Sequence, residues 1–107
     1  MSEKFVNTIQ STKPVLTEGS VIERLRRESA VHLDPYCMHA GLVYDDRGRA
    51  ALSTIMNEYF ERAMKYGIPI LGFTPTWRAS RDRLRRARFS DGDDVNGECV
   101  RFMKKIR

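Results

Sequence analysis

Two residues that can bind a ligand follow an apolar run in the stretch KPVLTEGSVIERLRRE, residues 13–28. Val15 and Leu16 precede Glu18 and Gly19, and a helical pattern begins at once. If the apolar run is a buried strand, the Glu18 carboxylate lies at its carboxyl end, where α/β proteins bind ligands. The alternative is structural, because an acid in the first helical turn is stabilised by the helix dipole and a glycine suits the turn before it.

A second candidate site stands at the end of the apolar run IPILGFT, residues 68–74. Thr74, Thr76 and Trp77 lie at or just beyond the end of this run, and the indole of Trp77 could form the wall of a pocket. The alternative for all three residues is strand-end packing and turn formation. Both interpretations remain open from the residues alone.

The two cysteines and two histidines do not form a metal-binding pattern. Cys37 and Cys99 lie far apart without a CxxC or Cys/His spacing, and we expect them to be reduced thiols. Cys99 falls on an apolar helical stripe, which predicts core packing. His32 and His39 flank Cys37, but a metal site needs three or four converging ligands, so we expect them to be hydrogen-bonded loop residues. We therefore expect no catalytic residue and no metal ligand in this chain.

Six arginines stand in RASRDRLRRAR, residues 78–88, in a chain of net charge +5. Such a block could hold phosphates or nucleic acid. Arginine is also a good helix former, so a solvated helix face explains the run without any partner. The sequence has no helix-turn-helix, zinc-finger or RRM pattern, and nucleic-acid binding is therefore not expected.

Hydrophobic periodicity predicts one long helix over residues 47–66, with apolar residues at three- and four-residue steps. Asp45 or Asp46 suits its amino-terminal cap and Gly67 its carboxyl-terminal stop, while Ser20 is a candidate cap for an earlier helix. The other expected helices cover residues 2–11, 20–28, 80–88 and 93–107, and the expected strands cover residues 14–17 and 68–74.

The alternation of strands and helices predicts an α/β fold with buried parallel strands. With 107 residues the chain is at most one domain. Two parallel strands leave two open edges, and parallel sheets need flanking elements, so the fold is expected to be incomplete in this chain. Residues 1–13 would form a leader with a short helix before the first strand.

Two segments resemble the homocysteine S-methyltransferase family (the Hcy-binding domain). PVLTEGSVIERLRRE resembles the family's opening, in which the first strand ends in an acidic, glycine-rich signature. DDRGRAALSTIMNEYFERAMKYGIPILGFTPTWRAS, residues 45–80, is similar to the family's next helix and strand, with Ala63, Gly67 and Thr74 among the matched positions. The resemblance covers residues 14–107.

The resemblance implies an eight-stranded (β/α)8 barrel, of which this chain would supply the N-terminal segment with the first two βα units. Enzymes of the family transfer a methyl group to the thiol of homocysteine, making methionine, and use zinc held by cysteines. Those cysteines belong to later parts of the barrel, and Cys37 and Cys99 match none of them. Zinc is thus implied for the complete protein, no cofactor is expected in this chain, and the chain alone is expected to be inactive.

The resemblance also assigns a substrate site. Glu18, with Gly19 beside it, takes the place of the family's acidic residue and would bind the amino end of a homocysteine-like thiol. Here glutamate replaces the usual aspartate, Ser20 opens the replacement of the glycine-rich turn, and Pro75 replaces an asparagine. The expected substrate-binding set is Glu18, Gly19, Thr74, Thr76 and Trp77.

Two other functions remain open. One is a stand-alone basic α/β module that binds nucleic acid or another anionic ligand through residues 78–88, and the other is a non-catalytic pseudoenzyme. The open sheet also predicts self-association or pairing with a complementary chain. No apolar run approaches the roughly 20 residues of a membrane span, and MSEKFVNTIQ has no signal-peptide core, so a cytoplasmic chain without a membrane partner is expected.

Overall fold

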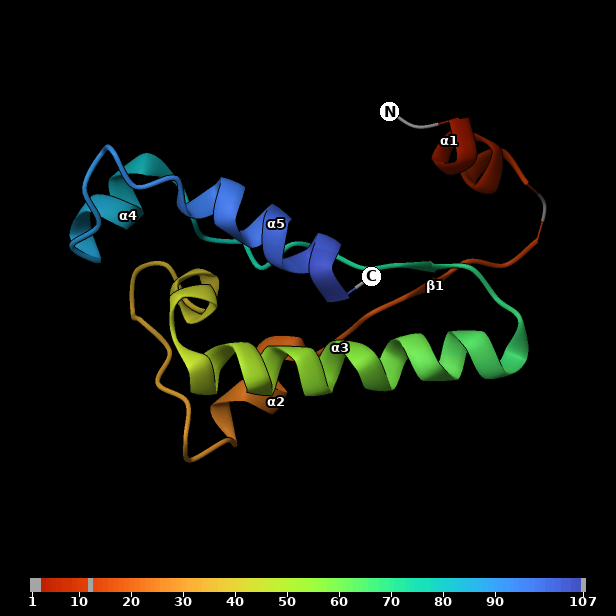
Figure 1. The fold of residues 1–107 in the computed structure, drawn as a ribbon, viewed down its shortest axis with the longest axis horizontal. Helices are drawn as coiled ribbons and strands as arrows, with labels where there is room; N and C mark the ends of the chain where they lie inside the picture. Colours follow the sequence, from red (N-terminus) through yellow and green to blue (C-terminus); the bar gives the residue numbers. More distant parts are fainter. Residues whose placement is uncertain (1–2, 12, 107) are drawn as a thin grey trace.

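Helix α3 is the longest element, and it extends along the molecule with α2 on one side and α5 on another (Figure 1). The computed structural model describes residues 3–11 and 13–106. None of the helices in this part of the chain combines the length and the apolar character that crossing a membrane requires. The elements in chain order are α1 (Glu3–Gln10), β1 (Leu16–Thr17), α2 (Val21–Arg26), the 3-10 helix η1 (Ala40–Tyr44), α3 (Asp46–Tyr66), β2 (Ile70–Leu71), α4 (Arg81–Arg86) and α5 (Val95–Ile106).

Both ends of α3 are fixed by residues whose chemistry suits a helix terminus. The side chain of Asp45 accepts a hydrogen bond from the backbone N–H of Gly48 at 2.9 Å, which satisfies one of the free donors of the first turn. Gly67 ends the helix in the left-handed conformation, with a φ of 63°, where a side chain would be strained. The predicted helix is confirmed, with Asp45 rather than Asp46 as its cap.

The hydrophobic core forms where η1 contacts both α3 and α5. Leu52, Ile55 and Met56 lie on one face of α3 and are at most 2% exposed. Burying each such side chain contributes about 1.5–3 kcal/mol, so this face holds the other elements in place. Cys99 is fully buried, which confirms its predicted packing role. The core cluster also includes Val21, Leu25, Leu42, Val43, Val95 and Phe102.

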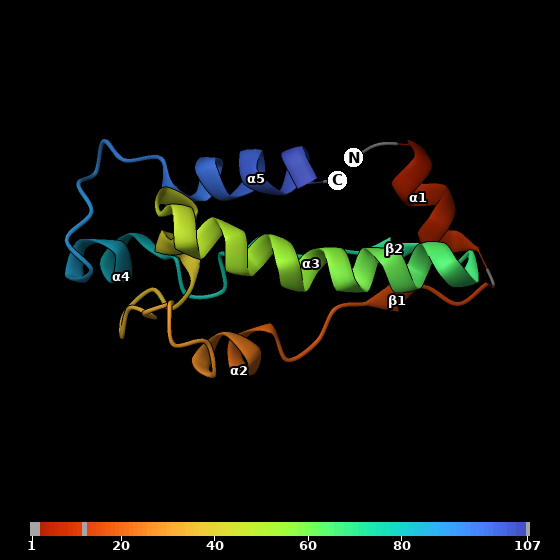
Figure 2. The ribbon, with the colours of Figure 1, turned by 60° about the horizontal axis from the view of Figure 1, so that its bottom comes forward.

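The two strands pair in parallel beside α3 (Figure 2). Leu16 lies opposite Ile70 and Thr17 opposite Leu71, and each strand is two residues long. The predicted parallel pairing is confirmed, but the paired segments are much shorter than the apolar runs that contain them.

The predicted α/β architecture, the first two βα units of an eight-stranded barrel, is wrong. The described residues are mostly helical, and their only sheet is the two-stranded pair. A parallel sheet needs burial on both faces, yet Ile70 and Leu71 are only half-buried and Phe73 is 51% exposed. Most apolar burial is made between helices instead, so this part of the chain is a small, predominantly helical domain.

The other helices depart from their predicted bounds or caps. The predicted leader, residues 1–13, contains α1, which has no buried residue; residues 1–2 and 12 lie outside the described residues. Ser20 does not cap α2 with its side chain, because its own backbone is left-handed with a φ of 56°. The last helix, expected over residues 93–107, spans Val95–Ile106, and residue 107 again lies outside the described residues.

Candidate functional site

An open pocket of about 450 Å³ lies where the chain leaves the two strands. β1 is followed by Glu18 and Gly19, and β2 by Phe73 and Thr74. Because the strands are parallel, both segments leave the sheet at the same end. Trp77 lines the same pocket, so the structure brings together four of the five predicted site residues: Glu18, Gly19, Thr74 and Trp77.

The carboxyl group of Glu18 is partly buried in the pocket wall. Its Oε2 atom is shielded from solvent and has no hydrogen-bond partner among the described residues. Burial raises the pKa of Glu18 because the charged form loses hydration, and the backbone N–H of Phe73 opposes part of the rise. A buried acceptor without a donor costs about 1–3 kcal/mol. A ligand that donates a hydrogen bond to Oε2 would remove this cost.

The turn that carries Glu18 is tied to α3. The hydroxyl of Tyr59 donates a hydrogen bond to the backbone carbonyl of Gly19 at 2.5 Å. One residue earlier in α3, Glu58 forms an ion pair with Arg24 of α2, with 2.5 Å between nitrogen and oxygen. Two adjacent residues of the long helix therefore hold both the pocket turn and the helix that follows it.

The residues after β2 form the opposite wall. Thr74 lines the pocket, and its hydroxyl lies 3.2 Å from the hydroxyl of Thr76. Thr76 does not line the pocket, and its contact with the pocket wall is the one to the hydroxyl of Thr74. Pro75, which lies between the two threonines, is fully buried. Trp77 is 62% exposed, and the guanidinium of Arg78 lies 4.3 Å from the centre of its ring, a cation–π contact. Trp77 thus forms the rim of the pocket rather than its floor.

His39 is a pocket residue that the sequence did not assign to the site. It was predicted to be a hydrogen-bonded loop residue, but it lines the pocket at 7% exposure. Its Nδ1 atom is buried and has no hydrogen-bond partner among the described residues. Burial lowers the pKa of the imidazole to about 4, because the charged ring would lose its hydration. The only sequence signal for its burial was the set of small and apolar neighbours, of which Cys37 and Ala40 are fully buried.

The two cysteines are core residues rather than metal ligands. Cys37 and Cys99 are both free and buried, and the thiol of Cys99 donates to the carbonyl of Ala40 at 3.4 Å. Burial raises the pKa of Cys99 to about 12, and burial together with the Asp34 carboxylate raises the pKa of Cys37. A thiol must lose its proton to bind zinc. Within residues 3–11 and 13–106, no three His, Cys, Asp or Glu side chains gather in a way that could hold a metal ion. These residues do not fit the zinc that the family resemblance implies.

The arginine-rich segment has partners within the chain. Arg83 donates to the backbone carbonyl of Tyr36 at 3.0 Å. Arg85 forms two hydrogen bonds to Asp91, at 2.8 and 2.6 Å, and Arg78 lies over the neighbouring indole. Contacts inside the protein therefore account for three of the six arginines, which favours the structural interpretation of this run over a nucleic-acid interface.

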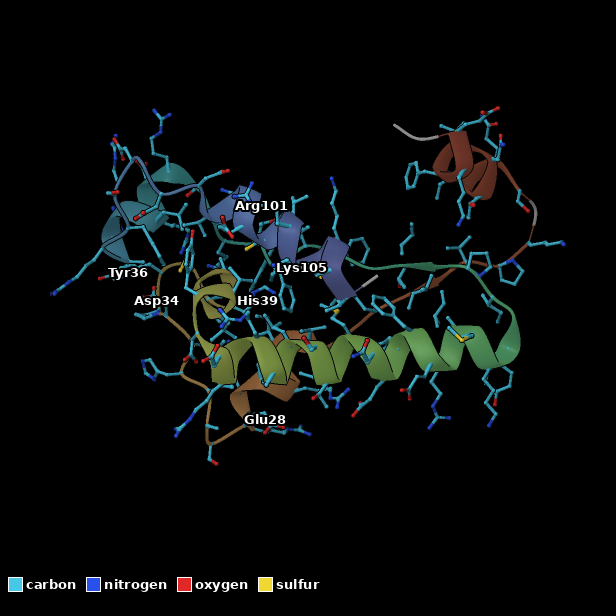
Figure 3. The ribbon with its side chains drawn as sticks, in the orientation of Figure 1. Glu28, Asp34, Tyr36, His39, Arg101 and Lys105 are labelled. Atoms are coloured by element: carbon cyan, nitrogen blue, oxygen red, sulfur yellow. The ribbon has the colours of Figure 1, made fainter. Side chains whose placement is uncertain are left out.

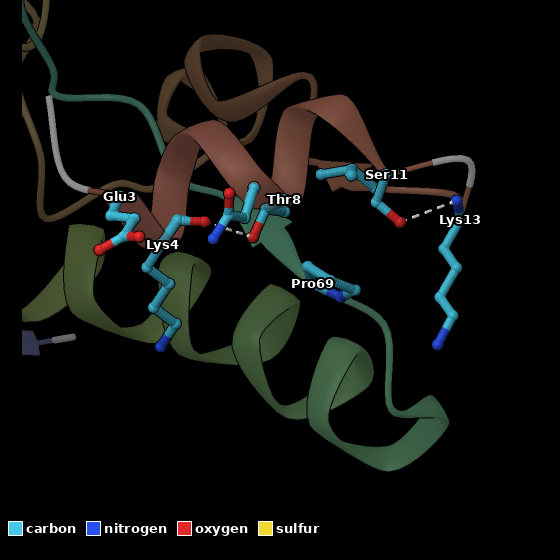
Figure 4. A pocket seen from close by; sticks show the side chains of 8 residues that line it. Glu3, Lys4, Thr8, Ser11, Lys13 and Pro69 are labelled. Atoms are coloured by element: carbon cyan, nitrogen blue, oxygen red, sulfur yellow. Dashed lines mark hydrogen bonds between the residues drawn. The ribbon is translucent and has the colours of Figure 1, made fainter.

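Two larger hollows lie away from Glu18. One, of about 540 Å³, lies between α1 and the residues that precede each strand (Figure 4). Two of its polar side chains already make local hydrogen bonds, from the hydroxyl of Thr8 to the carbonyl of Lys4 at 2.8 Å and from the N–H of Lys13 to the hydroxyl of Ser11 at 3.1 Å. The other, of about 880 Å³, is a mainly apolar groove along α3, β2 and α5. Neither contains a buried polar group without a partner, which sets the Glu18 pocket apart.

Comparison of the chain with models of known protein families, with curated proteins and with solved structures found no match. The relationship to the homocysteine S-methyltransferases therefore stays a prediction. The site is interpreted from its own chemistry, which combines a partly buried carboxylate, a buried neutral imidazole and an aromatic rim.

Proposed function

We propose that this chain binds the amino end of a small thiol such as homocysteine in the Glu18 pocket, as the substrate-binding part of a methyltransferase. The observation that supports the proposal is the Oε2 atom of Glu18, which is buried without a partner on a residue that lines a pocket of ligand size. An ammonium group placed there would supply the missing hydrogen bond and compensate the carboxylate charge.

Other pocket residues suit the remainder of such a ligand. The indole of Trp77 offers an apolar surface for the carbon chain that carries the thiol. Arg26 also lines the pocket and is paired with Glu23 at 2.9 Å on the surface. A guanidinium binds a carboxylate through two parallel hydrogen bonds, so Arg26 is suited to the acidic end of an amino acid.

The described residues are assigned substrate binding and orientation, and not the transfer step. The thiols of Cys37 and Cys99 are buried in the core with raised pKa values, so neither is available as a thiolate at neutral pH. We therefore expect the chain to bind substrate without turning it over.

Calorimetric titration with homocysteine tests the proposal. Glu18→Gln keeps the size of the side chain but removes its charge, and we expect it to weaken homocysteine binding about tenfold or more. Glu28→Gln is the matched control, because Glu28 is exposed and lies outside the pocket lining (Figure 3). The analogue of homocysteine without its amino group should bind equally weakly to all three proteins. Equal homocysteine affinity in the wild type and in Glu18→Gln would refute the proposal.

A further inference from the structure

We infer that His39 is the second ligand-binding residue of the Glu18 pocket, and that the two residues select a primary ammonium group. The ammonium would donate one hydrogen bond to the carboxylate of Glu18 and another to Nδ1 of His39. The inference rests on the proposed function only in using the same pocket, and it does not require the ligand to be a thiol.

The unpartnered buried polar atoms belong to two residues that line this pocket. Among the described residues, two side-chain atoms are buried without a hydrogen-bond partner: Oε2 of Glu18 and Nδ1 of His39. Both residues line the same cavity, although they are far apart in the chain. Buried polar groups are nearly always hydrogen-bonded, so two exceptions in residues that line one cavity favour a ligand that supplies the missing donors.

The loop before His39 is closed by hydrogen bonds, which hold the backbone that carries the imidazole in place. Asp34 and Met38 exchange two backbone hydrogen bonds, at 3.1 and 2.9 Å. The carboxylate of Asp34 also accepts from the N–H of Tyr36 at 2.7 Å. Cys37 and Ala40, on either side of His39, are fully buried. His39 is therefore held inside the fold (Figure 3), and moving it into solvent would break the packing on both sides.

Backbone strain lies next to both polar groups. Ser20, two residues after Glu18, and Met38, immediately before His39, each have a φ of 56°. The left-handed conformation costs a non-glycine residue about 1–2 kcal/mol. Strain of this kind persists where surrounding structure enforces it and is concentrated at functional sites. Two of the three non-glycine residues with positive φ among the described residues therefore lie in the segments that carry Glu18 and His39, and the third is Arg88.

The charge state of His39 determines which ligand group it can accept. Burial lowers the pKa of its imidazole to about 4, so the ring is neutral at neutral pH. The inference requires the neutral tautomer that carries its proton on Nε2, because that tautomer offers Nδ1 as an acceptor; the Glu18 carboxylate is also an acceptor. A pair of acceptors requires a ligand with at least two donors. A primary ammonium has three donors, a quaternary ammonium has none, and an anion would be repelled by Glu18.

Binding of simple amines tests the inference without assuming a thiol ligand. We would titrate n-butylamine, homocysteine and tetramethylammonium into the wild type, His39→Leu, His39→Asn and Glu18→Gln, after confirming by circular dichroism that each protein is folded. We expect His39→Leu to weaken n-butylamine about tenfold or more. His39→Asn should retain most of the affinity, because its amide oxygen can accept a hydrogen bond near the position of Nδ1. Affinity for tetramethylammonium should be the same in the wild type and in His39→Leu, since that ion has no N–H donor.

The outcomes separate this inference from the proposed function. If folded His39→Leu binds n-butylamine as well as the wild type does, or if the wild type binds no amine, the inference is wrong. If homocysteine binding depends on Glu18 but not on His39, the inference fails and the proposed function stands. If n-butylamine depends on both residues and homocysteine binds no better than n-butylamine, the inference stands and the proposed function fails. His32→Leu, at an exposed histidine outside the pocket, is the control for a general effect of replacing histidine.

Discussion

The buried, neutral His39 predicts that the protein loses stability in mild acid. Its pKa falls from the ordinary value of 6.5 to about 4 on folding, because the buried ring loses hydration. Between these two values the unfolded chain binds a proton at this position and the folded chain does not. The titration of His39 therefore leaves the free energy of unfolding constant above about pH 6.5. Below that pH the free energy of unfolding falls as the pH is lowered towards 4. Over the whole interval the loss amounts to about 3 kcal/mol, a large share of the stability of a small domain.

His39→Leu removes this titration and fills the space of the imidazole with an apolar side chain. Urea unfolding, followed by far-ultraviolet circular dichroism from about pH 8 to about pH 4, gives the free energy of unfolding of each protein. We expect the wild type to lose about 3 kcal/mol relative to His39→Leu across this range. Glu18, whose raised pKa gives a contribution of opposite sign, is present in both proteins and largely cancels. The exposed His32→Leu should behave as the wild type does. Parallel curves for the wild type and His39→Leu would refute the reasoning.

Three further predictions concern α3 and can be checked by the same urea measurement at neutral pH. Leu52→Ala should cost about 2–5 kcal/mol, because Leu52 is fully buried, and a loss below 1 kcal/mol would contradict its place in the core. Asp45→Ala should lower the free energy of unfolding by about 1 kcal/mol through loss of the cap, whereas Asp45→Asn should keep most of the stabilisation. Equal losses of stability in the two variants would argue against the hydrogen bond to Gly48. Gly48→Ala should destabilise by about 1–3 kcal/mol although alanine favours helices, because its Cβ would lie 2.6 Å from the backbone oxygen of Leu42, and a more stable variant would show that this contact relaxes freely.

Helix α3 could be predicted from the sequence because its ends depend on local interactions. The cap at Asp45 reaches only three residues along the chain, and the stop at Gly67 depends on the backbone freedom of one residue. The fold class could not be predicted in the same way. The apolar runs around Leu16 and Ile70 carry no local signal for how many residues will pair or whether both faces will be covered. That number depends on what packs against them, and here helices bury most of the apolar surface instead.

The site was predictable to the extent that it follows from parallel pairing. Once two apolar runs pair in parallel, the residues after them must lie at one end, and this places Glu18 near Thr74. Thr76 was assigned to the lining only because of its position in the sequence, and it lies behind Thr74. His39 was missed because its burial depends on how a whole loop packs against the core. No periodic pattern reports that kind of burial.

The hydrogen bond between Tyr59 and Gly19 also bears on the order of folding. It joins residues 40 positions apart, and closing a loop of that length costs about 3 kcal/mol of chain entropy beyond a constant. The backbone hydrogen bonds of helix α3 are local, so the helix can begin to form before this loop closes. We therefore expect a folding stage in which the chain is already helical but has no assembled pocket. Stopped-flow measurements would then show circular dichroism recovering before amine binding, so that recovery of ligand affinity reports the final closure of the chain.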